Sequence, residues 1–204
     1  MLKQLYLIRH GQTDFNLKGI VQGSGVDAPL NEFGMKQAAA FHSAYAHLDF
    51  DMVFVSELQR THQSVAAFAN RITTEKHAGL NEIGWGIHEG KAVTASDRAD
   101  FKRLIHDWQQ GKLERSLPFG ESALDVARRQ QPILSKLNTQ TEEQILVCMH
   151  GRAMRILLCQ LLKIPLQEMD QFEHSNLCLY HLEMNANQNW NVLKFNDTRH
   201  LDLL

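Results

Sequence analysis

The segment LYLIRHG, residues 5–11, joins an apolar run directly to three residues of a different character. Its first four residues have the composition of a buried β-strand, and Arg9, His10 and Gly11 follow without a spacer. A strand end of this kind has two interpretations. The polar residues either mark the point where the strand reaches solvent, or belong to a site that the strand holds in place. The rest of the chain decides between them.

Strands and helices are predicted to alternate along the remainder of the chain. The predicted strands cover residues 2–8, 51–56, 73–78, 145–149, 176–184 and 189–196. The predicted helices cover residues 32–48, 58–70, 96–110, 122–138 and 152–163, with Ser56 as a candidate cap of the second. This alternation predicts an α/β fold, a three-layer sandwich with a mostly parallel sheet, helices on both faces and an antiparallel hairpin at one edge. The length fits a single domain spanning residues 1–204.

Bulk composition limits the classes of protein that fit. The 204 residues are 44% hydrophobic and 22% charged, with a formal net charge of −2. We therefore expect no nucleic-acid partner, and no apolar run nears the ~18 residues that a membrane span needs. The first strand is too short for a signal peptide. Three scattered cysteines in apolar surroundings, Cys148, Cys159 and Cys178, indicate free thiols and a cytoplasmic location.

A second apolar run ends in the same way as the first. Residues 145–149 are followed by His150 and Gly151. Because ligands bind outside the carboxyl ends of the strands in such sheets, His10 and His150 are expected at one edge. The helix after residues 51–56 adds Arg60, and the Gly-rich segment GLNEIGWG, residues 79–86, contains one acidic residue, Glu82.

Two histidines, two arginines and one carboxylate suit the transfer of a phosphoryl group. The planar fork of an arginine pairs with phosphate oxygens, and a histidine can act as a covalent nucleophile. A glutamic acid kept protonated by partial burial can protonate the leaving oxygen. The arginines and the second histidine supply the positive charge, so this interpretation requires no metal ion and no other cofactor.

At this point the residues match a known family. LIRHG at 7–11 resembles the signature of the histidine phosphatase superfamily, which includes cofactor-dependent phosphoglycerate mutases. Four further segments match in order: residues 27–38, SELQRT at 56–61, the segment of Glu82, Gly86, Glu89 and Gly90, and His150-Gly151 with Arg155. The resemblance covers nearly the whole chain and implies a phosphoglycerate mutase-like fold with a small helical lid at about residues 83–125.

The resemblance also implies a role for each residue of the candidate site. His10 is expected to become phosphohistidine, and Glu82 to act as general acid and then as base for the incoming water. Arg9, Arg60 and His150 are expected to hold the phosphoryl group. The residues expected to bind substrate around it are Asn16, Gln22, Gly23 and Gly151, the last by orienting its neighbour, whereas Arg155 is expected to be structural.

Three departures from the mutase pattern favour a phosphatase. Mutases of this family usually carry Arg after the catalytic Glu and Asn after the second His-Gly, where this chain has Ile83 and Arg152. The segment between Glu82 and His150 is also shorter than is typical of mutases, which leaves water more access. The resemblance thus implies a phosphomonoester hydrolase acting on a small phosphorylated metabolite.

Other interpretations stay open at this level. The chain fits a phosphoglycerate mutase, and a metal-dependent hydrolase with His10, His150 and Glu82 as ligands is a further class. A non-catalytic relative that binds a phosphate compound or a protein is another. The basic residues Lys91, Arg98, Lys102 and Arg103 either recognise a second anionic group or form a solvated helix face. The chain fits a monomer or a homodimer, and the sequence does not name the substrate.

Overall fold

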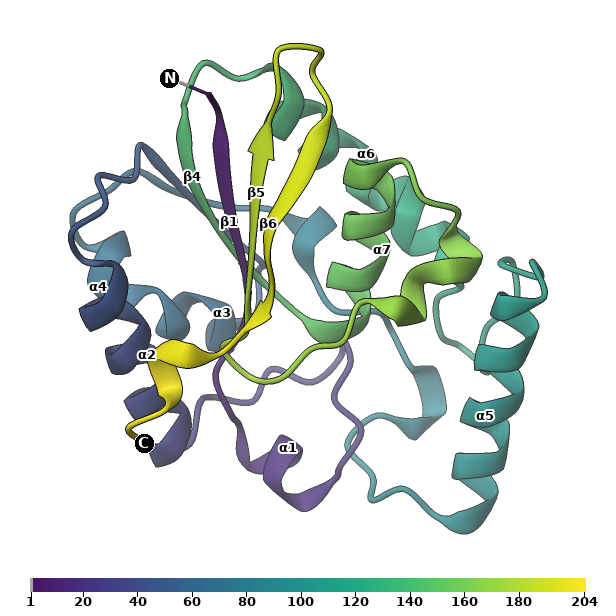
Figure 1. Ribbon diagram of the computed structural model, residues 1–204. Helices are drawn as coiled ribbons and strands as arrows, with labels where there is room; N and C mark the ends of the chain where they lie inside the picture. The colour runs from purple at the N-terminus through teal and green to yellow at the C-terminus, as the bar shows by residue number, and fades with distance from the viewer. Residues whose placement is uncertain (1) are drawn as a thin grey trace.

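The computed structural model describes residues 2–204, whose strands form one six-stranded sheet in the order β3-β2-β4-β1-β5-β6 (Figure 1). The first four strands in the chain run parallel, whereas β5 pairs antiparallel with both β1 and β6. The predicted mostly parallel sheet with an antiparallel edge hairpin is therefore confirmed. The strands are β1 (Gln4–Arg9), β2 (Met52–Val55), β3 (Thr74–Lys76), β4 (Gln144–Met149), β5 (Leu179–Met184) and β6 (Trp190–Asp197).

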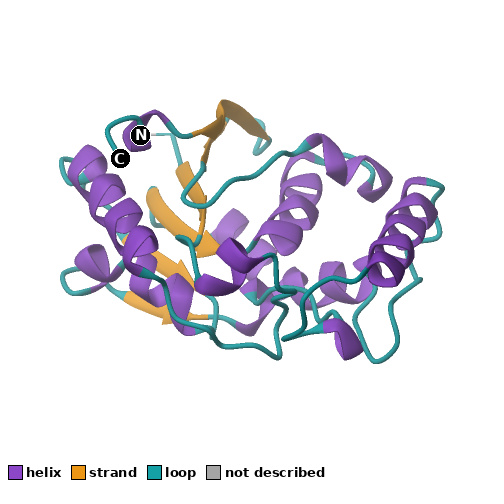
Figure 2. Ribbon diagram, turned by 90° about the horizontal axis from the view of Figure 1, so that it is seen from below, coloured by secondary structure: helices purple, strands orange, loops and turns teal. Residues whose placement is uncertain are grey.

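Helices lie on both sides of the sheet, which confirms the three-layer sandwich (Figures 1 and 2). One face is covered by α2 (Glu32–Tyr45), α3 (Gln59–Ser64) and α4 (Ala66–Ala69), and the other by α6 (Ala123–Thr139) and α7 (Gly151–Leu162). The remaining helices are α1 (Asp14–Lys18), α5 (Ala95–Gln109) and the 3-10 helices η1 (Ala78–Leu80), η2 (Gly86–His88), η3 (Leu166–Gln171) and η4 (Arg199–Leu201).

The central strands are apolar on both faces because each face meets a layer of helices. In β1, Leu5 and Leu7 belong to the hydrophobic core beneath α6 and α7, whereas Tyr6 and Ile8 belong to the core beneath α2 and α4. The alternation follows from the two-residue period of a strand. All four side chains are nearly or fully buried, so β1 is a rigid support for the residues that follow it.

Several predicted elements differ from the observed ones. Residues 11–31, where no helix or strand is predicted, contain α1, which Thr13 caps through a reciprocal pair of hydrogen bonds with Asn16. The predicted helix at 58–70 is divided at Val65 into α3 and α4. Ser56 does not cap it: Leu58 occupies the cap position, and the Ser56 hydroxyl accepts the N–H of Leu58 instead. A side chain engaged in a local turn cannot also cap a helix that starts later.

Residues 83–125 extend to one side of the sheet and contain η2 and α5, which Figure 1 draws at the lower right. Trp85 packs against Phe101 and Trp108, with ring centroids 5.2 and 6.3 Å apart. Aromatic packing therefore holds Trp85 inside this segment. Phe119, by contrast, is 95% exposed and packs in no core.

Candidate active site

The strand register brings the two predicted histidines together. Arg9 of β1 pairs with Met149 of β4, and the backbone N–H of His10 donates to the Met149 carbonyl at 3.0 Å. The next residues, His10 and His150, therefore leave the sheet side by side, with ring centroids 5.0 Å apart. Both rings are almost fully buried. The parallel pairing of β1 and β4 is what joins two segments 140 positions apart in the sequence, the difference between 150 and 10.

His10 is held in one tautomer. Its Nδ1 lies 2.7 Å from the Gly11 carbonyl oxygen, which can only accept, so Nδ1 carries the proton. Burial, together with the nearby Arg9 and Arg60 guanidinium groups, holds the pKa of His10 well below its usual 6.5. The ring is therefore neutral at physiological pH, and its Nε2 presents an unprotonated lone pair.

His150 is fixed through both ring nitrogens. The Nε of Arg60 donates to its Nδ1 at 3.2 Å, so the proton of the neutral ring is on Nε2, 2.8 Å from the Ser56 hydroxyl. Ser56 in turn contacts the Thr61 hydroxyl at 3.0 Å, and Thr61 donates to the Leu58 carbonyl at 2.9 Å. For His150 to contact a phosphoryl oxygen as well, one ring nitrogen has to exchange its protein partner for the substrate.

Arg60 is fully buried, although it lies in the first turn of α3. Besides the bond to His150, its Nη1 donates to the Val26 carbonyl at 2.7 Å and its Nη2 to the Gly23 carbonyl at 3.3 Å. Burial lowers the pKa of Arg60 to about 10, so the guanidinium stays charged at neutral pH. Three of its five N–H groups are thus used, and the loop at 23–26 is tied to α3.

Arg9 lies beside a histidine that the sequence interpretation missed. The Nη1 of Arg9 is 3.3 Å from Nδ1 of His174, in the segment after η3. Burial and the charges of Arg9, Arg155 and Arg152 lower the pKa of His174 to about 3, so this ring is also neutral. In the described chain, the Nε of Arg9 is buried without a hydrogen-bond partner, which leaves a donor for an anion.

Glu82 lies at the amino end of α7. Its Oε1 accepts the backbone N–H groups of Ala153 at 2.9 Å and of Ile83 at 3.0 Å, and its Oε2 accepts that of Arg152 at 3.2 Å. A helix amino end presents free N–H groups and a partial positive charge, both of which attract a carboxylate. Glu82 is only 8% exposed, and its negative charge favours the charged forms of Arg9 and Arg60.

The polar residues predicted around the phosphate pocket form one network. The Nδ2 of Asn176 donates to the His10 carbonyl at 3.0 Å and to Oδ1 of Asn16 at 3.1 Å. Oδ1 of Asn16 also accepts the Thr13 N–H, and the Thr13 hydroxyl donates to Gln22 at 2.9 Å. Asn176, which the sequence interpretation did not assign to the site, thus connects Asn16 to the backbone of His10.

Two glycines of the predicted site, Gly23 and Gly151, let a neighbouring side chain lie close to the backbone. A Cβ atom at Gly23 would lie 2.1 Å from Oε1 of Glu89, and one at Gly151 would lie 2.5 Å from the His174 ring. Either substitution would force a neighbour to move. Gly23 thus permits the loop over Arg60, and Gly151 begins α7 while leaving room for His174.

Arg152 and Arg155 share one carboxylate oxygen, Oδ1 of Asp170 in η3. Arg152 also lies over the Trp108 ring, 5.7 Å from its centroid. The predicted structural role of Arg155 agrees with this ion pair. Together the pair fastens η3, and with it the segment that carries His174, to α7.

The cysteines do not fit a thiol nucleophile. Cys148 of β4 is fully buried, and burial raises its pKa, which opposes a thiol nucleophile. All three cysteines are buried free thiols, as predicted. Within residues 2–204, no group of three His, Cys, Asp or Glu side chains is arranged to hold a metal ion. Every helix in that range is too short or too polar to cross a bilayer.

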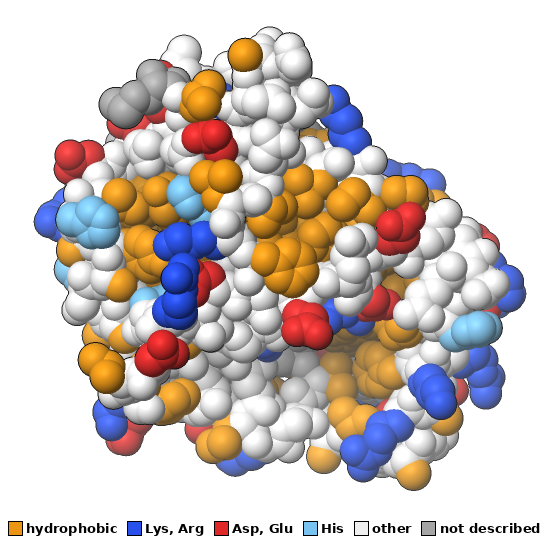
Figure 3. Space-filling view, in the orientation of Figure 1, with side chains coloured by type: hydrophobic (Ala, Val, Ile, Leu, Met, Phe, Trp, Pro, Cys, Tyr) orange, Lys and Arg blue, Asp and Glu red, His pale blue; other side chains and the backbone are white. Residues whose placement is uncertain are grey.

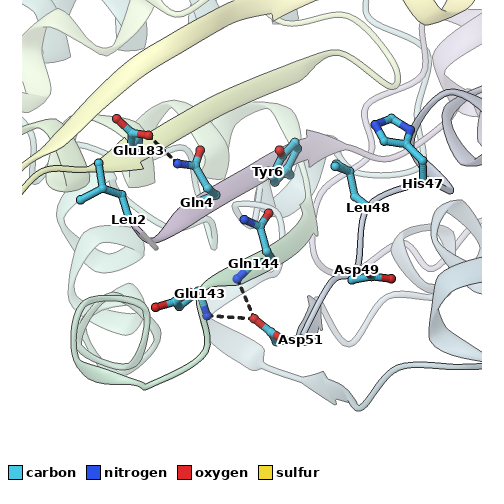
Figure 4. A pocket seen from close by; sticks show the side chains of 10 residues that line it. All are labelled: Leu2, Gln4, Tyr6, His47, Leu48, Asp49, Asp51, Glu143, Gln144 and Glu183. Carbon is cyan, nitrogen blue, oxygen red and sulfur yellow. Dashed lines mark hydrogen bonds between the residues drawn. The ribbon is translucent and has the colours of Figure 1, made fainter.

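The surface is hollowed between α1 and α5, on the side of the sheet where β1 and β4 end (Figure 3). A separate open pocket of about 620 Å³ lies at the opposite edge, near the amino ends of β1 and β4 (Figure 4). Its lining includes Asp49, Asp51, Glu143 and Glu183. Such an acidic lining repels phosphate, so this pocket does not suit the predicted phosphoryl site, which lies at the carboxyl ends of β1 and β4 beside His10 and His150.

Comparison with known proteins agrees with this geometry. The family model described as the histidine phosphatase superfamily, branch 1, matches residues 5–198. An adenosylcobalamin/alpha-ribazole phosphatase of Salmonella typhi is 27% identical over 86% of this chain and 87% of its own. The "Probable phosphoglycerate mutase GpmB" of Yersinia pestis (strain Pestoides F) is 27% identical over 98% and 95%. A solved structure named "Mycobacterial hydrolase 1" shares the fold with a TM-score of 0.85, at 23% identity over 97% of this chain and 100% of the other.

Proposed function

The chain belongs to branch 1 of the histidine phosphatase superfamily, and on that premise we propose that it is a metal-independent phosphomonoester hydrolase. The observation that carries the proposal is the state of His10. Its ring is neutral, its Nδ1 proton is committed to the Gly11 carbonyl, and the ring lies 5.0 Å from that of His150 and within the electrostatic influence of Arg9 and Arg60. This is the arrangement that a nitrogen nucleophile for a phosphoryl dianion requires.

In the first step, Nε2 of His10 attacks the phosphorus atom, a P–N bond forms and the ester P–O bond breaks. The leaving oxygen takes a proton from Glu82. We assign that proton to Oε2, because Oε1 already accepts two N–H groups whereas Oε2 accepts one at 3.2 Å.

In the second step, Glu82 takes a proton from a water molecule as the water oxygen attacks phosphorus. The P–N bond breaks, inorganic phosphate leaves and His10 returns to its neutral form. Arg60 and the free Nε–H of Arg9 hold the transferring group, with the Asn16 and Gln22 network beside it. The positive charge of the two guanidinium groups stabilises the charge that develops on the phosphoryl oxygens.

Two side chains favour water over a phosphoglycerate as the acceptor. Ile83 stands where a mutase carries a substrate-binding arginine, and its side chain is fully buried in the core. Arg152 is committed to Asp170 and Trp108. The basic group that a mutase carries after its catalytic Glu is therefore missing, and the arginine that stands in place of a mutase Asn is occupied. A phosphoglycerate mutase is the second candidate, supported by the full-length similarity to the Yersinia protein.

We infer that the substrate is a small phosphorylated metabolite, since phosphatases of such esters are among the relatives. Residues 83–125 are proposed to form the lid over it, because residues 90–92 pair with residues 20 and 21, next to Gln22 and Gly23 of the proposed substrate site. Three buried free thiols suit a reducing compartment, so we place the enzyme in the cytoplasm, as a monomer or homodimer.

The test is phosphate release from a panel of phosphomonoesters in excess chelator, for the wild type and for His10→Ala. We expect release by the wild type that chelator does not reduce, and none by the variant. Loss of release in chelator would contradict metal independence. If no ester is cleaved but phosphoglycerates interconvert, the chain is a mutase, and if neither reaction occurs, it is a binding protein.

A further inference from the structure

Arg129 of α6 donates hydrogen bonds to the whole segment that carries Glu82. Its Nη1 contacts the carbonyls of Ala78 at 3.2 Å and Gly79 at 3.0 Å. Its Nη2 contacts the carbonyls of Asn81 and of Glu82 itself, both at 3.0 Å. One guanidinium group therefore fixes four carbonyls over five consecutive residues. Such a fork of donors is available only from arginine.

Glu121 completes this attachment from the other side. It pairs with Arg129 through Nε at 2.7 Å and Nη2 at 3.2 Å. Its Oε2 also accepts the N–H of Gly84 at 2.8 Å, and its own N–H donates to the Gly84 carbonyl at 2.8 Å. The backbone is thus held on both sides of Glu82, at Asn81 and at Gly84.

This attachment matters because Glu82 lies in irregular chain between η1 and η2 and in no strand of the sheet. Its carboxylate reaches the amino end of α7 only if the backbone at 81–84 keeps its place. General acid catalysis depends on hydrogen-bond reach between the acid and the leaving oxygen, and small displacements are costly.

We propose that Arg129, supported by Glu121, is a positioning residue for the general acid Glu82. The inference rests on the proposed function, since it assumes that Glu82 protonates the leaving group. Arg129 touches no reacting atom in this scheme. It acts through the backbone, so its loss should impair protonation of the leaving group and spare the attack by His10.

Leaving-group dependence isolates that step. An alkyl phosphate needs its leaving oxygen protonated, whereas p-nitrophenyl phosphate releases a stable anion and needs little acid assistance. For Arg129→Met we expect kcat/KM, which reports only the steps up to release of the leaving group, to fall about 10–100-fold on an alkyl phosphate, up to the lower end (about 10²) of what general acid catalysis contributes. We expect kcat/KM on p-nitrophenyl phosphate to stay within about 3-fold, since acid assistance supplies little there.

Arg128→Met is the matched control. Arg128 is the neighbouring arginine on α6, its side chain is 73% exposed, and it pairs only with Asp125 among the described residues. It should leave both rates unchanged. If Arg129→Met does not fold, two milder variants keep most of the packing. Arg129→Lys removes part of the fork of donors, and Glu121→Gln removes the negative charge that pairs with Arg129. The same selective loss is expected from both.

A double variant adds a second measurement. In a Glu82→Gln background, Arg129→Met should cause no further loss on the alkyl ester, because the group that it positions is already absent. Equal losses on both esters, or a full additional loss in the double variant, would overturn the inference and leave Arg129 as a structural residue. Failure of the proposed function looks different, because the wild type itself would then cleave neither ester.

Discussion

The Nε of Arg60 and the Nδ1 of His150 are 3.2 Å apart, and this contact orders both residues. It fixes the tautomer of His150, which in turn donates to Ser56, and it leaves the two Nη atoms of Arg60 to reach the carbonyls of Gly23 and Val26. Helix α3, strand β4 and the loop at 23–26 therefore meet at one buried guanidinium group.

Arg60→Lys tests this relationship. A lysine keeps the positive charge but cannot place three donors on the ring of His150 and on two carbonyls. Removal of one preorganised donor costs about 10²–10³-fold in kcat. We therefore expect kcat of Arg60→Lys to fall at least about 10²-fold on any substrate that the wild type cleaves. The control is Arg71→Lys, an exposed arginine outside the site. A kcat within 3-fold of the wild type (where a cost of order 10² is expected) would contradict the role of the fork.

Glu82→Gln tests the general acid. The amide keeps the size of the side chain and cannot give a proton to the leaving oxygen. We expect kcat/KM, which reports the steps up to release of the leaving group, to fall about 10²–10⁴-fold on alkyl phosphates and much less on p-nitrophenyl phosphate. Steady-state rates on both esters provide the measurement, with the exposed Glu168→Gln as the control. Equal losses on the two esters would assign Glu82 to phosphate binding instead of proton transfer.

The pH dependence of kcat/KM follows from His10. The proposed mechanism requires a neutral His10 ring, so kcat/KM should fall when that ring takes up a proton. Because burial and two arginines lower the pKa of His10, this acidic limb should lie well below pH 6.5. The measurement is the kcat/KM profile on one ester from acid to neutral pH. An acidic limb at or above pH 6.5 would contradict the neutral state of the His10 ring.

Stability should also depend on pH through the same histidines. His10, His150 and His174 have lowered pKa values in the folded chain, so the unfolded chain binds more protons below pH 6.5. The free energy of unfolding therefore decreases as the pH falls below that value. For His174 the window extends from 6.5 to about 3.

The measurement is the denaturation midpoint between pH 7.5 and pH 5, compared between the wild type and His174→Asn. We expect the midpoint of the wild type to fall with acidification, and the variant to show a smaller fall, since one of the groups that takes up protons on unfolding is gone. The exposed His47→Asn should behave as the wild type. An identical pH slope in the His174 variant would show that this ring does not titrate as described.

The sequence predicted the residues that stand at strand ends. Arg9, His10 and His150 follow apolar runs directly, and parallel pairing then determines that they meet. Arg60 and Glu82 were candidates from their place after a strand and in a Gly-rich segment, and the family resemblance supplied their roles, because a helix position and an irregular segment carry no comparable periodic signal. The short helix α1 was missed because its five residues are fixed by the Thr13 cap and not by an apolar face.

The sequence did not predict the contacts of residues whose partners lie far away along the chain. His174 meets Arg9 across 165 positions, and Asn176 meets the His10 carbonyl across 166. Ser56 was interpreted as a helix cap because that is the commonest role of a serine before a helix, whereas its hydroxyl is bonded to His150. Arg129 lies in an ordinary amphipathic helix, and only the fold shows that its side chain reaches residues 78–82.

The central claim is a covalent intermediate on His10, and trapping that intermediate tests it most directly. The enzyme would be mixed with a radiolabelled phosphomonoester that it cleaves, quenched in alkali within milliseconds, and digested to find the labelled peptide. We expect label on the peptide that contains His10, stable in alkali and lost in acid as a P–N bond is, and none in His10→Ala. Phosphate release without labelled protein, or label on another residue, would contradict the account.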